Sequence, residues 1–141
     1  MTSFKTAGTL RYSPKLLGQV QSENWWVVLD CDPEISRYFR HLYFIHTYRK
    51  LQRPAWGAHI TVVANEEPED ARKPLWQKHE GLAVTIDVSM ELCDNEKFFW
   101  LGVESPVLSE IRVELGLPPL PKHPFHLTIG NAPEAEVLSR P

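Results

Sequence analysis

The sequence has little cysteine and no long apolar run. Its 141 residues include two cysteines, Cys31 and Cys93, which allow at most one disulfide and do not have the spacing of a metal site. No stretch approaches the ~18 consecutive apolar residues that a membrane-spanning helix needs, and residues 1–10 lack the apolar core of a secretory signal. We therefore expect a reduced, cytoplasmic protein that does not work at a membrane.

A large excess of charge of either sign is also absent. Lys and Arg total 15 and Asp and Glu total 18, a formal net charge of −3, while hydrophobic residues make up 43% of the chain and charged residues 23%. These values are ordinary for a globular protein and argue against disorder, a collagen-like repeat or a coiled coil. At this length we expect one compact domain spanning residues 1–141.

What the chain does contain is a regular succession of strands and helices. Apolar and β-branched runs predict strands at residues 8–13, 25–29, 58–64, 82–88, 98–103 and 125–129. Residues 32–33 and 105–106 each combine an N-cap residue with a proline at the first helical position, and they predict helices over 33–50 and 106–115. A shorter helical piece is expected at 74–78.

Two blocks of the sequence, residues 25–65 and residues 98–131, follow one plan. Each consists of an apolar strand, a capped helix, a proline-containing turn, and a strand that bears His-x-Thr and ends at asparagine. Two copies are too few for a solenoid. The sequence therefore predicts an α+β fold with pseudo-two-fold symmetry, in which each lobe packs helices on an antiparallel sheet.

The last strand of each block carries the most informative residues. These are His59 and Thr61 in the first motif, and His126 and Thr128 in the second. Alternate residues of a strand share a face, so the histidine and threonine of each motif lie together while the residue between them points into the core. Either motif alone is typical of an ordinary half-exposed strand, but the duplication favours a functional site where both motifs converge.

Two imidazoles and two hydroxyls suit the cleavage of a phosphodiester without a metal. One neutral imidazole can remove a proton from the attacking water or ribose 2′-hydroxyl, while the other, protonated, gives a proton to the leaving oxygen. The threonine hydroxyls can donate to the phosphoryl oxygens as negative charge develops. A metal site is a weaker alternative, because neither motif has a carboxylate or a third histidine at ligand spacing.

Charge along the chain favours a polyanionic ligand. Residues 35–65 and 115–133 contain no Asp or Glu, and each stretch contains one motif. The substrate-binding candidates in these stretches are Arg49, Lys50, Arg53, Lys122 and His123. Arg37 and Arg40 are instead expected on a solvated helix face. We expect contacts to a few phosphates of a nucleotide or oligonucleotide, not to a long DNA duplex.

Aromatic residues add candidates for binding a base, because base–aromatic stacking needs little sequence specificity. Trp56 precedes the first motif, Trp76 lies in an expected loop region, and Tyr12 lies on the N-terminal arm. The remaining tryptophans are in core-like strands and are expected to serve packing.

The two His-x-Thr motifs, 67 residues apart, resemble those of the 2H phosphoesterase superfamily. Its members include 2′,5′-RNA ligase-like proteins, 2′,3′-cyclic nucleotide phosphodiesterases, RNA 3′-end trimming enzymes and phage enzymes that cleave cyclic oligonucleotide signals. The short chain is similar to small phage or bacterial members, including RNA-repair-like and anti-CBASS groups. The resemblance covers residues 25–131. It implies a bilobal fold around a central cleft, metal-independent chemistry without a cofactor, and four catalytic residues: His59, Thr61, His126 and Thr128.

The function predicted from the sequence is a two-histidine phosphodiesterase. Its expected substrate is a nucleotide phosphodiester, either a 2′,3′-cyclic phosphate or a short linear or cyclic oligonucleotide. The alternative from another class is a non-catalytic RNA- or nucleotide-binding module with the same cleft, and a metal hydrolase is the third possibility.

Overall fold

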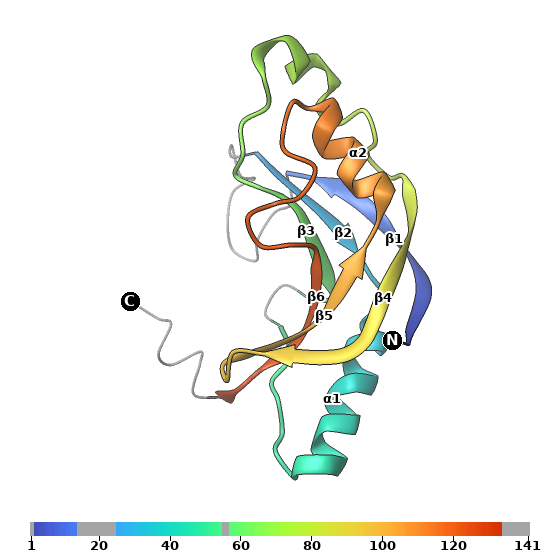
Figure 1. Cartoon of the computed structure of the whole chain (residues 1–141), viewed down its shortest axis with the longest axis vertical. Coiled ribbons are helices and arrows are strands. Elements are labelled where there is room, and N and C mark those ends of the chain that lie inside the picture. Colours follow the sequence, from blue (N-terminus) through green and yellow to red (C-terminus); the bar gives the residue numbers. More distant parts are fainter. Residues whose placement is uncertain (1, 14–24, 55–56, 134–141) are drawn as a thin grey trace.

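The described part of the chain, residues 2–13, 25–54 and 57–133 of a computed structural model, is built around one closed antiparallel sheet (Figure 1). Its strands are β1 (Ser3–Tyr12), β2 (Trp26–Asp30), β3 (His59–Ala64), β4 (Ala83–Asp94), β5 (Phe98–Glu104) and β6 (His126–Asn131). They follow the order β1-β2-β3-β6-β5-β4, and β4 pairs back onto β1. The α+β class is confirmed. The separate sheets expected for the two lobes are instead joined into a single sheet, because β3 and β6 are neighbours.

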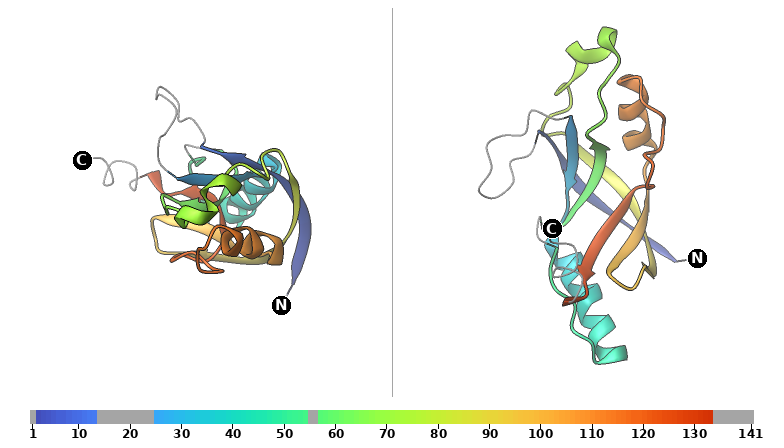
Figure 2. Two further views of the ribbon diagram at one scale, coloured as in Figure 1. Left: turned by 90° about the horizontal axis from the view of Figure 1, so that it is seen from above. Right: turned by 90° about the vertical axis from the view of Figure 1, so that its left-hand side faces the viewer.

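Helices lie at both ends of this sheet (Figures 1 and 2). They are α1 (Pro33–Thr47), the 3₁₀ helix η1 (Asp70–Leu75) and α2 (Pro106–Glu114). Both predicted caps are present: the Asp32 carboxylate accepts the Glu34 amide at 2.9 Å, and the Ser105 hydroxyl accepts the Leu108 amide at 3.2 Å. Among the described residues, no helix is long and apolar enough to cross a membrane.

Helix α1 ends earlier than the predicted residue 50. Tyr48, which follows it, adopts the left-handed conformation with φ +59°. The Thr47 hydroxyl donates to the Tyr43 carbonyl at 2.7 Å and accepts the Arg49 amide at 3.1 Å. The Arg49 amide, which a further turn of helix would bond to a backbone carbonyl, is thus bonded to this hydroxyl. Element ends elsewhere also differ, since β1 begins at Ser3, β4 continues to Asp94, and η1 precedes the expected helical piece.

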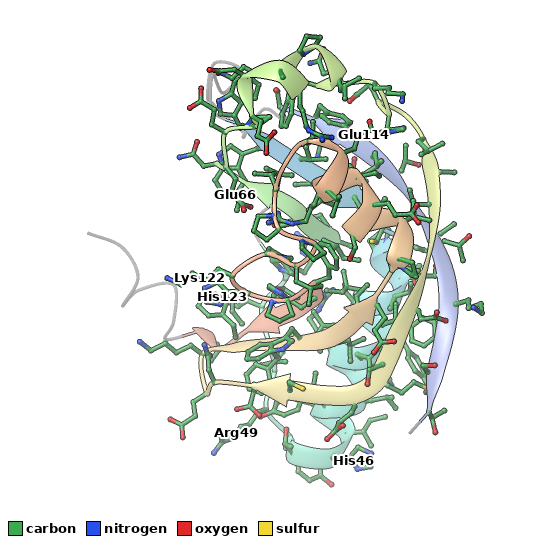
Figure 3. The ribbon with its side chains drawn as sticks, turned by 45° about the horizontal axis from the view of Figure 1, so that its top comes forward. His46, Arg49, Glu66, Glu114, Lys122 and His123 are labelled. Carbon is green, nitrogen blue, oxygen red and sulfur yellow. The ribbon has the colours of Figure 1, made fainter. Side chains whose placement is uncertain are left out.

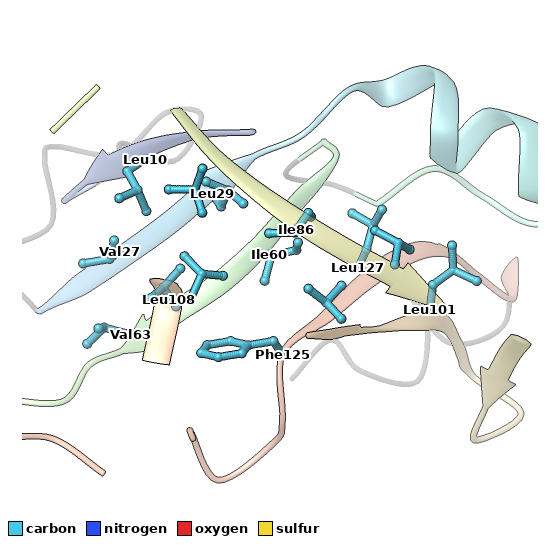
Figure 4. Packing of buried hydrophobic residues seen from close by; sticks show 14 of the residues in the cluster. Leu10, Val27, Leu29, Ile60, Val63, Ile86, Leu101, Leu108, Phe125 and Leu127 are labelled. Atoms are coloured by element: carbon cyan, nitrogen blue, oxygen red, sulfur yellow. The ribbon is translucent and has the colours of Figure 1, made fainter. Parts of the chain in front are cut away.

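The apolar core fills the interior of the closed sheet (Figure 4). Leu29, Ile60, Leu101 and Leu127, from four different strands, are fully buried. Phe39 of α1 and residues of α2 pack against the same cluster. Because successive residues of a strand point to opposite faces, this inward set fixes which residues of β3 and β6 face outward.

An ion pair ties α2 to the end of β3. Arg112, on α2, is completely buried and donates two hydrogen bonds to the Glu66 carboxylate, at 2.8 and 2.7 Å. Its remaining donors reach the carbonyls of Val62 and Pro118, both at 2.8 Å. One guanidinium thus holds three segments together, including the strand that carries the first motif.

We expect Glu66 to contribute to the loss of stability in acid. Hydrogen bonds from Arg112 hold the pKa of this carboxyl below its ordinary value of 4.5. A carboxyl whose pKa is lowered by folding stabilises the protein above its unfolded pKa, and this contribution is lost as the pH falls through its folded pKa. Between pH 7 and pH 3, the urea midpoint of unfolding should therefore fall further for the wild type than for Glu66→Gln. Equal falls in the two proteins would contradict this role.

Candidate functional site

The two motifs lie side by side on the outside of the sheet. Strand β3 carries the first motif and β6 the second; the strands are antiparallel, with Ile60 directly opposite Leu127. Both of these residues are fully buried, so their neighbours in sequence point to the other face. The structure therefore brings together all four motif residues, each of them half-buried: His59, Thr61, His126 and Thr128.

The register places each histidine beside the threonine of the other motif. Continuing the antiparallel pairing from Ile60 and Leu127 sets His59 opposite Thr128 and Thr61 opposite His126. The two histidines are then diagonal neighbours, a relation in which residues are about 7–8 Å apart. Imidazole and hydroxyl groups therefore alternate on this face of the two strands.

Both imidazole rings are oriented by the backbone in the same way. His59 Nδ1 lies 3.1 Å from the Gly57 carbonyl, and His126 Nδ1 lies 2.8 Å from the Pro124 carbonyl. A carbonyl oxygen only accepts hydrogen bonds, so Nδ1 is the donor in each case. The second nitrogen, Nε2, is therefore the atom that gains or loses a proton on each ring.

An ion pair adjoins the first motif. Asp30 of β2 is the direct strand partner of His59, and the Arg11 guanidinium donates to both oxygens of its carboxylate, at 2.8 and 3.0 Å. The sequence pattern alone predicts neither residue of this pair as part of the site. The available signal was the position of Asp30 at the end of an apolar strand, but its pairing with His59 depends on a register between segments distant in sequence.

Burial and nearby charges set the proton affinity of His59. Burial lowers the pKa of the imidazole below its ordinary value of 6.5. The hydrogen bond to Gly57 and the negative charge of Asp30 raise this pKa in part, whereas the positive charges of Arg11 and His126 lower it. Since the balance is downward, the neutral form of His59 is favoured near neutral pH.

Strand β5 borders the second motif. Gly102 is the direct strand partner of His126, and Trp100 is the partner of Thr128. The Trp100 and His126 rings meet edge to face, with centroids 6.2 Å apart. Gly102 and Pro124 also line an open hollow of about 650 Å³. Space large enough for part of a ligand therefore adjoins His126.

The basic and imidazole substrate-binding candidates are dispersed. Arg49 and Lys50 are exposed and follow the end of α1, whereas Lys122 and His123 are exposed on the loop that leads to β6 (Figure 3). Arg53 lines a second hollow, beside the start of α1. Of these candidates, Lys122 and His123 are close in sequence to a motif strand, and Lys50 and Arg53 line separate hollows.

The aromatic candidates do not gather at the motifs. Tyr12 is buried in the core, and its ring meets Trp76 at a centroid distance of 5.1 Å. Trp76 also meets Trp25 at 4.9 Å. Burial raises the pKa of Tyr12 to about 12. The structure thus places Tyr12 and Trp76 in a packing cluster, and Trp56 lies outside the described residues.

The described residues contain no group of three or more His, Cys, Asp or Glu side chains arranged to hold a metal ion. The donors gathered at the motifs are two imidazoles and two hydroxyls, with the Asp30 carboxylate already bound by Arg11. Such a set favours proton transfer and hydrogen bonding to an anion.

Comparison with known proteins identifies the family of the chain. No curated protein and no solved structure matches it. The family model described as "Swiss Army Knife, 2H phosphoesterase domain" matches residues 29–136, a range that includes α1 and both motif strands. The chain therefore belongs to the 2H phosphoesterases, in the Swiss Army Knife family.

Proposed function

We propose that the protein is a metal-independent phosphodiesterase that cleaves a nucleotide phosphodiester by general acid–base catalysis. The substrate is a 2′,3′-cyclic phosphate or a short linear or cyclic oligonucleotide. The observation that carries this proposal is the pairing of β3 with β6, which sets two imidazoles and two hydroxyls on one face. The face of the two motifs is then the place where the scissile phosphate binds.

The two histidines have different roles in this proposal. His59 is the general base, because its burial favours the neutral form. Its Nε2 removes the proton from the attacking water or ribose 2′-hydroxyl. His126 is then the general acid, and its Nε2 gives a proton to the leaving oxygen. The carbonyl of Pro124 keeps the His126 ring oriented for this transfer.

The threonines and the surrounding charge favour binding of the phosphate and stabilise its negative charge. Thr61 and Thr128 donate hydrogen bonds to the phosphoryl oxygens that gain negative charge in the transition state. Both motifs lie in stretches without a carboxylate, residues 35–65 and 115–133. This local charge distribution favours the approach of an anion despite the net charge of −3.

A product assay over several linkages tests this function. The panel contains 2′,3′-cyclic nucleoside monophosphates, 2′,5′-linked and 3′,5′-linked dinucleotides, and cyclic di- and trinucleotides, each with and without EDTA. We expect turnover of at least one class, unchanged by EDTA. Binding without turnover of any class would favour the non-catalytic module. Activity lost in EDTA and restored by zinc or manganese would favour the metal hydrolase.

The pH dependence should report the environment of His59. We expect kcat/KM to be bell-shaped, with the acidic limb below the ordinary histidine pKa of 6.5, because burial lowers the pKa of the base. Asp30 raises that pKa, so Asp30→Asn should move the acidic limb to lower pH and leave the alkaline limb in place. The control Asp70→Asn removes an exposed carboxylate that pairs with Lys73 and should move neither limb. An acidic limb unchanged by Asp30→Asn would contradict the role of His59 as base.

A further inference from the structure

A second concave surface lies at the start of α1. It is a hollow of about 410 Å³ whose lining includes Pro33, Ser36 and Arg40 from the first turns of the helix, and Arg53 and Gly57 from the segment before β3. None of the four motif residues lines it. It is nevertheless close to them, since Gly57 also accepts the hydrogen bond from His59 Nδ1 at 3.1 Å.

Two arginines, Arg40 and Arg53, line this hollow. Among the described residues, neither Arg40 nor Arg53 forms an ion pair. Burial lowers the pKa of Arg40, and the nearby positive charges of Arg53 and Arg37 lower this pKa further. Like charges repel, so an anion held between the two guanidinium groups relieves an unfavourable interaction.

Arg40 is held in place before any ligand binds. Its Nη1 donates to the Ile129 carbonyl at 2.7 Å. A Cβ at Gly130 would lie 3.1 Å from Arg40 Cδ, so the glycine allows the arginine stem to pack closely against β6. The sequence pattern predicts a solvated helix face for Arg40, whereas the structure partly buries this side chain. Such fixation lowers the entropy cost of binding a phosphate.

A buried hydroxyl also belongs to this site. Ser36, which is 2% exposed, lines the hollow, and its Oγ has no hydrogen-bond partner among the described residues. The two carboxylates nearby are already engaged, because Asp32 caps the Glu34 amide and Glu34 pairs with Arg37.

We propose that Arg40 and Arg53 form a second phosphate subsite, so that the preferred substrate carries another phosphate beside the scissile one. This inference rests on the proposed function for the identity of the scissile phosphate. Of the proposed substrates, it disfavours mononucleotide cyclic phosphates that carry no other phosphate. It favours oligonucleotides and nucleotides with a further terminal phosphate. Gly57 lines the hollow and also contacts His59, so the two phosphates lie near each other along one ligand.

Binding of matched dinucleotides tests the subsite independently of turnover. The probes are an unphosphorylated dinucleotide and the same dinucleotide with one added phosphate, at its 5′ or at its 3′ end. Their dissociation constants are measured on the His126→Ala variant, in which cleavage is slow, and on the same variant with Arg53→Gln added. The matched control is Lys97→Gln, which removes the same charge from an exposed side chain that does not line the hollow.

One of the two added phosphates should tighten binding by about tenfold or more, the usual strength of a hydrogen-bonded charge pair. Arg53→Gln should abolish most of this gain, while Lys97→Gln should retain it. The salt dependence should agree: the added phosphate should steepen the slope of log Kd against log salt by about 0.7, and Arg53→Gln should remove the increment. The end of the dinucleotide, 5′ or 3′, at which the added phosphate tightens binding shows on which side of the scissile phosphate the subsite lies.

The outcomes separate the subsite from the catalytic proposal. No gain from either added phosphate, or a gain that Arg53→Gln leaves intact, would overturn the subsite even if the protein is an active phosphodiesterase. A gain that depends on Arg53, in a protein that turns over no phosphodiester, would instead retain the subsite as a phosphate-binding surface and reject the catalytic function. Arg40→Lys, which keeps the charge but loses the planar fork, should reduce the gain less than Arg53→Gln.

Discussion

Replacing His59 or His126 with alanine should lower kcat on a confirmed substrate by about 10²–10⁴-fold, the usual contribution of a positioned general acid or base. The expectation follows from the geometry of the two motif strands, which presents both imidazoles on one face with Nδ1 bound to a backbone carbonyl. Each substitution removes a proton-transfer group without disturbing the buried residues between the motif positions. KM should change much less than kcat.

The double variant should be far from additive. If the two histidines act as one unit, removing the second costs little once the first is gone. His46→Ala is the matched control, because His46 is exposed near the end of α1 (Figure 3) and should retain wild-type turnover. Circular dichroism and Tm confirm that the variants fold. Turnover near the wild-type level in both single variants would show that the motif face is not the active site.

Replacing Arg112 with methionine should destabilise the protein by about 3–5 kcal/mol, the cost of removing one partner from a buried ion pair. Arg112 is fully buried and bonded to Glu66 and to two backbone carbonyls. Methionine fills much of the space but leaves these acceptors without their donor. For a domain of this size the corresponding fall in Tm is roughly 10–17 °C.

Comparison with a surface pair isolates the effect of burial. Arg37 and Glu34 form an exposed pair at 3.3 Å, so Arg37→Met should change stability by less than about 1 kcal/mol. Combining Arg112→Met with Glu66→Gln should cost less than the sum of the single changes, since the two residues share one interaction. A loss below about 1 kcal/mol for Arg112→Met would show that the ion pair does not anchor α2 to β3.

The motif strands could be predicted from the sequence because their signals are local. Alternation of buried and outward residues around Ile60 and Leu127 indicates which side chains share a face. The caps at Asp32 and Ser105 are likewise local signals, and both are present in the structure. The duplicated His-x-Thr likewise predicts a shared site, because both copies follow the same local pattern.

The closure of the sheet could not be predicted in the same way. Strand β1 pairs with both β2 and β4, and such registers depend on contacts between residues far apart in the chain. The Arg11–Asp30 pair beside His59 follows from those registers. So does the burial of Tyr12, because the outward position of Arg11 turns its neighbour into the core. An aromatic residue on a strand gives no local sign of which face it occupies.

The most direct test of the two-histidine mechanism compares two leaving groups. The substrates are a nucleotide p-nitrophenyl phosphodiester and the same phosphodiester with a nucleoside leaving group. Because p-nitrophenolate leaves without protonation, loss of the general acid matters little for the first substrate. On that substrate we expect His126→Ala to recover to within about tenfold of the wild type, and His59→Ala to stay impaired on both. Recovery by His59→Ala in place of His126→Ala would reverse their roles, and equal impairment of the two variants on both substrates would contradict a mechanism in which one histidine is the base and the other the acid.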